Sequence, residues 1–153
     1  MKYLVIHCTA TPEGREVTAA DIRHWHCDPP ATGGRGWKQV GYTDLVHLDG
    51  SIERLVDNNE DAEVDPWEIT NGAAGYNAVS RHVVYAGGVS KHDGKPLDTR
   101  TLEQKKALAD YVRNFHSRFP QIRIVGHNEL NSKKACPSFD VQEWLRSLGI
   151  RQA

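Results

Sequence analysis

The sequence predicts an α/β fold in which a single mixed central β-sheet is flanked by helices. Three kinds of observation lead to this class. Short β-rich apolar runs end in turns, helix-capping patterns precede apolar stripes of helical spacing, and one strong hairpin turn joins two strand-like segments. The 153 residues are enough for one domain with a substantial core, and no internal repeat interrupts them. We therefore expect a single domain over residues 1–153.

The N-terminal segment has the pattern of a strand followed by a helix. Residues 3–8 form a short apolar, β-rich run that stops at a turn before Pro12, which is typical of a buried strand. Thr18 and Asp21 have the spacing of a capping pair, so we expect a short helix over residues 18–27.

The middle of the chain contains a hairpin between two loops. Residues 28–36 include two prolines and three glycines, which predicts a loop. Strand-like segments follow at 40–48 and 52–57, and the Asp49-Gly50 pair between them is the strongest short hairpin signal in the chain. Residues 58–80 are polar and irregular, and a segment of this length without regular structure usually builds a binding surface.

A third strand and a long helix come next. Residues 82–86 form a strand that leads into a loop at 89–100, and Thr101 with Gln104 forms a capping box. The apolar stripe that follows at helical spacing consists of Leu108, Tyr111, Val112, Phe115 and Phe119.

The last elements are a strand and a helix. Pro120 ends the long helix, and a short strand at 122–125 delivers His127. Asp140 and Glu143 then begin a final helix. The apolar residues that it is expected to bury are Val141, Trp144, Leu145 and Leu148.

The overall composition excludes several classes of protein. Apolar residues make up 39% of the chain and charged residues 25%, which is the soluble globular range. With a net charge of −1 at pH 7, the chain has no electrostatic footprint for nucleic acid or for an anionic membrane. We therefore expect neither nucleic-acid binding nor stable membrane association.

The N-terminus and the cysteines bear on the cellular compartment. The apolar run before His7 is too short for the hydrophobic region of a signal peptide. The chain has three cysteines, Cys8, Cys27 and Cys136, and an odd number argues against a disulfide framework. We expect synthesis in the cytoplasm without a signal peptide.

Three residues have the chemistry and the placement of a metal site. His7 and His127 each close an apolar strand, where catalytic groups of α/β sheets tend to lie. Cys136 follows in the polar turn Lys134-Ala135-Cys136-Pro137, where a nearby cation and a metal favour the thiolate. Two neutral imidazoles and a thiolate suit Zn²⁺, and three protein ligands leave its fourth position open for water. Because such a site makes water a better nucleophile, the pattern predicts a hydrolase.

The same three residues also fit roles that involve no zinc hydrolase. Cys136 has the alternative of a small buried apolar residue. A blue-copper site usually has an axial methionine, and the only methionine is Met1. A His-Asn-His nuclease would use His127-Asn128, but the chain has no matching basic surface and no second metal histidine nearby. Cys8 neighbours His7 on one strand, so its side chain should point to the opposite face.

The remaining histidines are expected in ordinary roles. His24 and His26 lie two apart in the predicted helix and cannot share a face, which favours surface or packing positions. The strand residues His47 and His82 are expected in the core or at its rim. The loop residue His92 and the helix-end residue His116 are expected on the surface.

Tyr42 and Lys134 each have two interpretations. Tyr42 begins a strand that should pass close to the first one, so it is either a packing residue or a phenol that donates to a developing oxyanion. Lys134, two residues before Cys136, is either a solvated loop cation or a second group that stabilises the same charge. Residue type alone leaves both choices open.

Several groups of residues also follow one another in a distinctive order. They are Ile6–Thr11, Ile22–His26, Gly36–Tyr42, Gly75–Asn77 with Ser80, Gly87-Gly88, Gly126–Glu129 and Lys134–Asp140. Together they resemble the zinc-dependent N-acetylmuramoyl-L-alanine amidases of type 2, the family of phage lysozyme-type amidases and peptidoglycan recognition proteins. The resemblance extends from about residue 3 to residue 148.

The resemblance implies a site and a reaction. It implies zinc bound by His7, His127 and Cys136, with Tyr42 and Lys134 as the catalytic polar pair. It also implies a single catalytic amidase domain that cleaves the amide between N-acetylmuramic acid and the L-alanine of the peptidoglycan stem. We expect a monomeric phage or prophage endolysin that acts on the cell wall after release or delivery. The alternative is a non-catalytic peptidoglycan-binding or regulatory protein of the same fold.

Some positions depart from the family pattern. Relatives have His-Phe or His-Tyr after the strand tyrosine, whereas this chain has Thr43-Asp44, so Asp44 faces either the groove or a neighbouring polar group. The strand after Ser80 usually begins Ile-Gly or Val-Gly, and here it begins Arg81-His82. The substrate groove is expected to be edged by the loops at 28–36 and 58–80.

Overall fold

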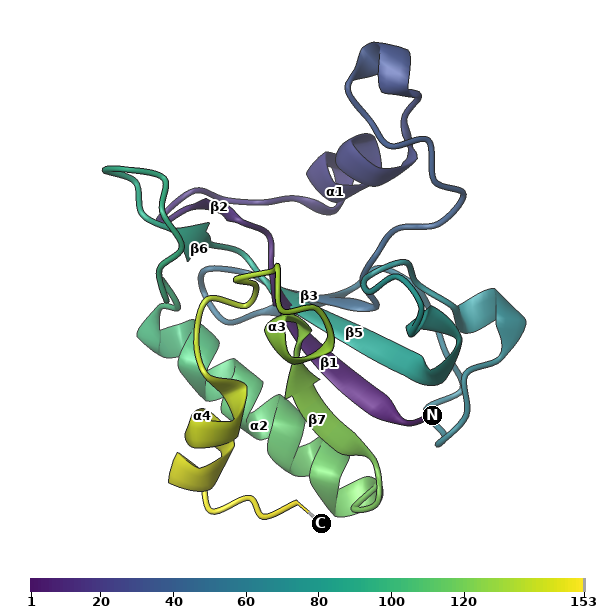
Figure 1. The fold of residues 1–153 in the computed structure, drawn as a ribbon, viewed down its shortest axis with the longest axis vertical. Coiled ribbons are helices and arrows are strands. Elements are labelled where there is room, and N and C mark those ends of the chain that lie inside the picture. Colours follow the sequence, from purple (N-terminus) through teal and green to yellow (C-terminus); the bar gives the residue numbers. More distant parts are fainter. Residues whose placement is uncertain (153) are drawn as a thin grey trace.

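The protein is built around a five-stranded mixed sheet, seen in a computed structural model that describes residues 1–152 (Figure 1). The strand order is β4-β3-β5-β1-β7, in which only β4 runs antiparallel to its neighbour. These strands are β1 (Tyr3–Cys8), β3 (Asp44–Val46), β4 (Ile52–Arg54), β5 (Ser80–Tyr85) and β7 (Arg123–Gly126). The predicted fold class, a mixed central sheet flanked by helices, is confirmed.

The central strand β1 determines where the site forms. It pairs in parallel with β5 on one side and with β7 on the other, so the carboxyl ends of all three strands meet at one edge of the sheet. Residues Leu4 to Cys8 are all buried, which is expected for a strand covered on both faces. His7 lies at the end of β1, and His127 comes directly after β7.

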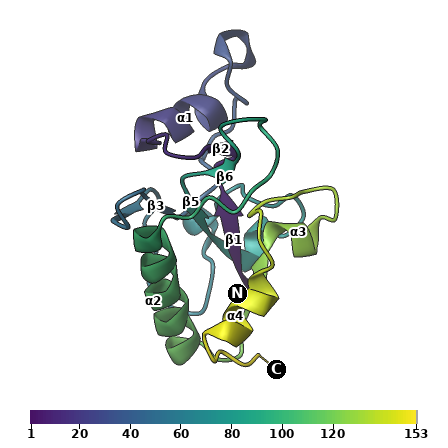
Figure 2. The ribbon, with the colours of Figure 1, turned by 90° about the vertical axis from the view of Figure 1, so that its left-hand side faces the viewer.

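Helices cover both faces of this sheet. The helices α2 (Leu102–Arg118) and α4 (Val141–Ser147) pack against one face, and α1 (Ala19–Cys27) lies beyond the carboxyl edge and covers part of the other (Figures 1 and 2). The larger core, between the sheet and α2 with α4, contains Leu4, Ile6, Val83, Tyr85, Leu108, Val112, Ile124, Val141 and Leu145. Within residues 1–152, no helix has both the length and the apolar character that crossing a membrane requires.

The predicted caps form at the three predicted helices, α1, α2 and α4. Thr18 with Asp21 and Thr101 with Gln104 are reciprocal capping boxes, each pairing a threonine hydroxyl and a side-chain acceptor with backbone N–H groups. The Asp140 carboxylate accepts a hydrogen bond from the Glu143 N–H at the start of α4. Local sequence therefore set the N-terminal ends of the helices, as predicted.

The predicted hairpin forms, but its strands are shorter than expected. The strand-like segments at 40–48 and 52–57 reduce to the three-residue strands β3 and β4 on either side of the Asp49-Gly50 turn. The ladder stops because the N–H groups of Leu55 and Val56 both converge on the carbonyl of Thr43. Two donors on one acceptor cannot continue the alternating antiparallel pattern.

Several small elements were not predicted. Residues Thr11–Pro12 (β2) and Gly88–Val89 (β6) form a separate two-stranded sheet, and His127–Leu130 (α3) is a single helical turn. Three short 3₁₀ turns, η1, η2 and η3, lie within the predicted loops, at Pro30–Thr32, Pro66–Glu68 and Asn77–Val79.

Asp44 lies on the α2 side of the sheet, away from the carboxyl-edge groove. Its buried carboxylate accepts a hydrogen bond from the Arg54 Nε at 2.7 Å and another from the Tyr111 hydroxyl at 2.7 Å. Of the two predicted orientations, the one toward a neighbouring polar group is therefore correct. The two partners satisfy a buried charge that would otherwise be costly.

Candidate metal centre and groove

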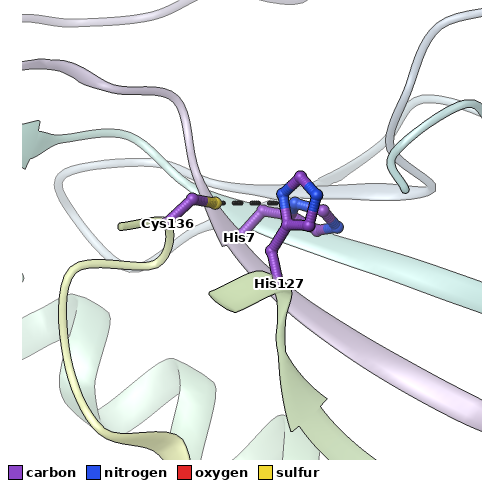
Figure 3. A group of neighbouring side chains, drawn as sticks. All are labelled: His7, His127 and Cys136. Carbon is purple, nitrogen blue, oxygen red and sulfur yellow. Dashed lines mark hydrogen bonds between the residues drawn. The ribbon is translucent and has the colours of Figure 1, made fainter. Parts of the chain in front are cut away.

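The three residues expected as metal ligands converge at the carboxyl edge of the sheet. One potential donor atom from each of His7, His127 and Cys136 lies within 4.8 Å of the others (Figure 3). The His7 Nδ1 is 3.6 Å from the Cys136 Sγ. They come from the end of β1, the first turn after β7 and the following loop. Residues 120 positions apart in the chain thus meet because β1 and β7 are parallel neighbours.

The loop that carries Cys136 is tied to the sheet on several sides. The Asn128 N–H donates to the carbonyl of Cys136 at 2.8 Å, and the Tyr85 hydroxyl donates to the carbonyl of Pro137 at 2.6 Å. The backbone N–H of Cys8 points at the Cys136 Sγ, 3.2 Å away. These contacts hold the sulfur beside His7 and give it a hydrogen-bond donor suited to a thiolate.

The electrostatics of the site suit a zinc ion. Burial lowers the pKa of the His7 imidazole well below its usual range, and neighbouring histidines lower it further. Burial also lowers the pKa of His127, with Lys134 adding to the effect. Both rings are therefore neutral at pH 7 and retain a lone pair. Two imidazole nitrogens and one sulfur form the soft, mixed donor set that zinc prefers.

The Cys136 thiol is the group that a metal would have to deprotonate. Its hydrogen bond with the Cys8 thiol raises the pKa of Cys136, and burial raises it further. A coordinating zinc ion displaces such a proton, which couples metal binding to proton release. Cys8 itself packs with Leu4 and Ile6 in the larger core, on the face opposite to His7, as predicted. It does not belong to the ligand group found among residues 1–152.

A groove of about 760 Å³ is lined by His127 and Cys136, whereas the buried His7 is not among its lining residues. Tyr42 and Lys134 both line it, and the Tyr42 ring lies 5.2 Å from the His7 ring, measured between centroids. Burial raises the pKa of the Tyr42 phenol above its usual value, so the hydroxyl stays protonated. Within residues 1–152, neither the Tyr42 hydroxyl nor the Lys134 ammonium group has a hydrogen-bond or ion-pair partner. Both are thus free to donate to a molecule in the groove.

Three further loops contribute to the walls of the groove. The predicted loop at 28–36 contributes Arg35, whose guanidinium stacks on the nearby Trp37. The segment at 58–80 contributes Asn71, Gly72, Ala74 and Asn77. A third part of the wall, formed by Gly88, Val89 and Pro96, was not predicted. It depends on the small β2–β6 sheet, which has no signal in the local sequence.

His26 is a groove residue that the sequence did not identify. Its Nδ1 accepts a hydrogen bond from the Gly41 N–H at 2.9 Å, and its ring lies between those of Trp37 and Tyr42. The imidazole thus supports the backbone immediately before Tyr42. Burial lowers the pKa of His26 to about 4, with Arg35 adding to the shift.

Because His26 is buried in its neutral form, we expect the stability of the fold to decrease at acidic pH. Between its folded-state pKa of about 4 and the unfolded value of ~6.5, the unfolded chain binds a proton that the folded chain does not. The free energy of unfolding therefore falls as the pH is lowered through this window. One such ring changes the free energy of unfolding by at most about 1.4 kcal/mol per pH unit, and solvent in the groove reduces this effect.

Urea unfolding at pH 7, 6 and 5 in the presence of a chelator measures this effect. His26→Asn keeps an acceptor for the Gly41 N–H but cannot titrate, so its loss of stability between pH 7 and pH 5 should be smaller. Because other buried histidines respond equally in both proteins, the difference isolates His26. An identical pH dependence in the two proteins would contradict the expectation.

Fold and site together place the chain in a known class. It belongs to the N-acetylmuramoyl-L-alanine amidase family, whose sequence pattern matches residues 1–139. The predicted family resemblance is therefore confirmed. The chain is 31% identical to the endolysin of Enterobacteria phage K11 over 142 residues, which cover 93% of this chain and 83% of that protein.

The fold is also found in solved structures of other proteins. The N-acetylmuramoyl-L-alanine amidase LysC from Clostridium intestinale URNW aligns with a TM-score of 0.70 and 20% identity, covering 98% of this chain and 86% of that one. Bumblebee PGRP-SA aligns with a TM-score of 0.65 and 18% identity, covering 95% of this chain and 80% of that one. The fold is thus common to an amidase and to a member of the PGRP group.

Proposed function

We propose that this protein is a zinc-dependent amidase that cleaves the bond between N-acetylmuramic acid and the L-alanine of the peptidoglycan stem. Residues 1–153 act as one catalytic domain. The observation that carries the proposal is the convergence of His7, His127 and Cys136, two of which line a groove, in a chain of this amidase family. The set of donor atoms, two imidazole nitrogens and one sulfur, supports zinc as the metal.

In this proposal each residue has a separate task. His7, His127 and Cys136 hold the zinc ion. When bound, the metal acts as a Lewis acid on the scissile carbonyl and lowers the pKa of water toward neutrality. The Tyr42 hydroxyl and the Lys134 ammonium group donate to the carbonyl oxygen as it becomes negative, which selectively stabilises the transition state. Their lack of competing partners in the described chain leaves both groups available.

The biological role follows from the relatives. The matched protein of phage K11 is an endolysin, and we infer the same role here, with peptidoglycan as the partner. The protein would be made in the cytoplasm, work as a monomer and act on the cell wall after release or delivery. The net charge of −1 offers no attraction for nucleic acid or an anionic membrane.

Digestion of purified peptidoglycan tests the reaction and its metal. The expected products, identified by mass spectrometry, are free stem peptides that begin with L-alanine and glycan strands that keep intact lactyl groups. A chelator should stop the reaction, and added zinc should restore it. Release of disaccharide-peptides would instead indicate glycosidase activity, and undiminished cleavage after exhaustive chelation would contradict the zinc requirement.

A further inference from the structure

Behind the candidate metal centre lies a row of three hydrogen-bonded side chains. The Nε2 of His7, on the side of the ring away from Cys136, is 2.8 Å from the Nδ1 of His82. The Nε2 of His82 is in turn 3.1 Å from the Oδ1 of Asn77. That same oxygen accepts a hydrogen bond from the backbone N–H of Ala73 at 2.8 Å.

The backbone group at the end of this row fixes the direction of every hydrogen bond in it. The N–H of Ala73 can only donate, so the atom of Asn77 that faces it must be the carbonyl oxygen. An oxygen that faces His82 can only accept, so the His82 Nε2 carries a proton. In a neutral ring the His82 Nδ1 is then an acceptor, and the His7 Nε2 must donate to it. The His7 Nδ1, which faces the Cys136 Sγ, is left with a free lone pair.

We propose that His82, held by Asn77, is the positioning residue that fixes His7 in the Nε2–H tautomer and so prepares its Nδ1 to bind the metal. This inference rests on the proposed zinc site. A metal-ligating histidine usually donates its other ring N–H to a carboxylate, a carbonyl or water. Here a second, neutral histidine takes that place. Which of its ring nitrogens donates and which accepts is set, through Asn77, by the backbone N–H of Ala73.

The surroundings of His82 support this role. His7 and His82 are 1% and 0% exposed, so water does not compete for the hydrogen bond between them. His82 is fully buried, and a charged imidazolium would be costly in such a place, so the neutral ring with an accepting Nδ1 is favoured. A Cβ on Gly72 would lie only 2.6 Å from the His82 Nδ1, so the ring occupies space that any larger residue at position 72 would take. Gly72 and His82 are therefore matched in shape.

The alternative is that His82 only fills space in the core. Two variants separate the roles. His82→Leu keeps apolar volume but removes the acceptor, leaving the buried His7 Nε2–H without a partner, which favours the other tautomer. His82→Gln keeps one acceptor and one donor and should rescue the arrangement. A purely structural role predicts no such difference in tautomer between two variants that both fold.

Nitrogen-15 NMR of the histidine rings in chelator-treated protein gives the first readout. In the wild type, His7 and His82 should both be Nε2–H tautomers. His82→Leu should give a mixture for His7, while His82→Gln should stay close to wild type. The second readout is the zinc dissociation constant, measured by competition with a chromophoric chelator. It should rise about 10- to 100-fold in His82→Leu, the usual effect of losing such a partner, and much less in His82→Gln.

The possible results distinguish a positioning role of His82 from a purely structural one. An Nδ1–H tautomer of His7 in the wild type would overturn the proposal without any variant, so the test survives if His82→Leu fails to fold. Unchanged His7 tautomer and zinc affinity in a folded His82→Leu would also overturn it. If the wild type bound no zinc at all, the proposed function would fail instead, and the tautomer measurement would still decide the role of His82.

Discussion

Cys136→Ser is expected to abolish zinc binding and to slow peptidoglycan cleavage at least about a thousandfold, because the metal supplies several kcal/mol of transition-state stabilisation. The serine hydroxyl is nearly isosteric with the thiol but does not ionise at neutral pH. The variant therefore lacks the soft sulfur donor among the three proposed ligands. Metal analysis of the purified protein should give near-stoichiometric zinc for the wild type and little for the variant. The fold should persist, since the Cys136 loop is also held through its backbone.

The other two cysteines provide matched controls. Cys27→Ser changes a half-buried residue at the end of α1, and Cys8→Ser changes a core residue outside the ligand group. Both should keep their zinc and their activity, although Cys8→Ser should lose some stability. The substitution changes the contact between the Cys8 thiol and Cys136, but the hydrogen bond from the Cys8 backbone N–H to the Cys136 Sγ survives it. Full zinc occupancy in a His7→Ala, His127→Ala double variant would contradict the ligand assignment.

Elements with strong local signals could be predicted from the sequence. The helices α1 and α2 begin at capping boxes, whose energy comes from residues three apart, so a short window of sequence contains the whole interaction. The Asp49-Gly50 turn is similarly local, because Gly50 adopts a positive φ of 84° that glycine tolerates readily. The strand β1 was identified with the bounds that the structure has, since burial on both faces requires an unbroken apolar run.

Elements that depend on distant partners could not be predicted. The strands β2 and β6 have two residues each and exist only because Thr11 meets Gly88 across the fold. The shortening of the predicted strand at 40–48 likewise reflects where its partners lie, not its own residues. The β-propensity of a segment describes its fit to a pleated surface, and tertiary contacts decide how much of it is used.

The candidate site likewise contains residues that could be predicted from the sequence and residues that could not. The convergence of His7, His127 and Cys136 was predictable because both histidines close strands of one sheet, although their binding of zinc stays a prediction. His26 and His82 were assigned ordinary roles, since nothing in their neighbouring sequence distinguishes a groove or ligand-supporting histidine from a packing one. Their roles come from hydrogen bonds to Gly41 and His7, residues 15 and 75 positions away.

Lys134→Ala and Tyr42→Phe are each expected to slow turnover by about a hundred- to a thousandfold with little change in peptidoglycan binding, because each removes a donor to a charge that exists only in the transition state. Both variants should keep the fold and the zinc. Tyr42→Phe deletes a hydroxyl that has no partner in residues 1–152, so its loss leaves no buried group unsatisfied. Single-turnover cleavage of purified peptidoglycan, alongside a pull-down binding assay, separates the rate from the affinity.

Lys133 provides the control for Lys134. The two lysines are adjacent and both exposed, but Lys134 lines the groove and acts on the pKa of His127, whereas Lys133 is not among the groove residues of the described chain. Lys133→Ala should therefore retain wild-type turnover. If Lys134→Ala did so too, Lys134 would be only a loop cation. If Tyr42→Phe lost wall binding but cleaved at the wild-type single-turnover rate, Tyr42 would bind substrate without stabilising the oxyanion, and the zinc site would have to act without the phenol.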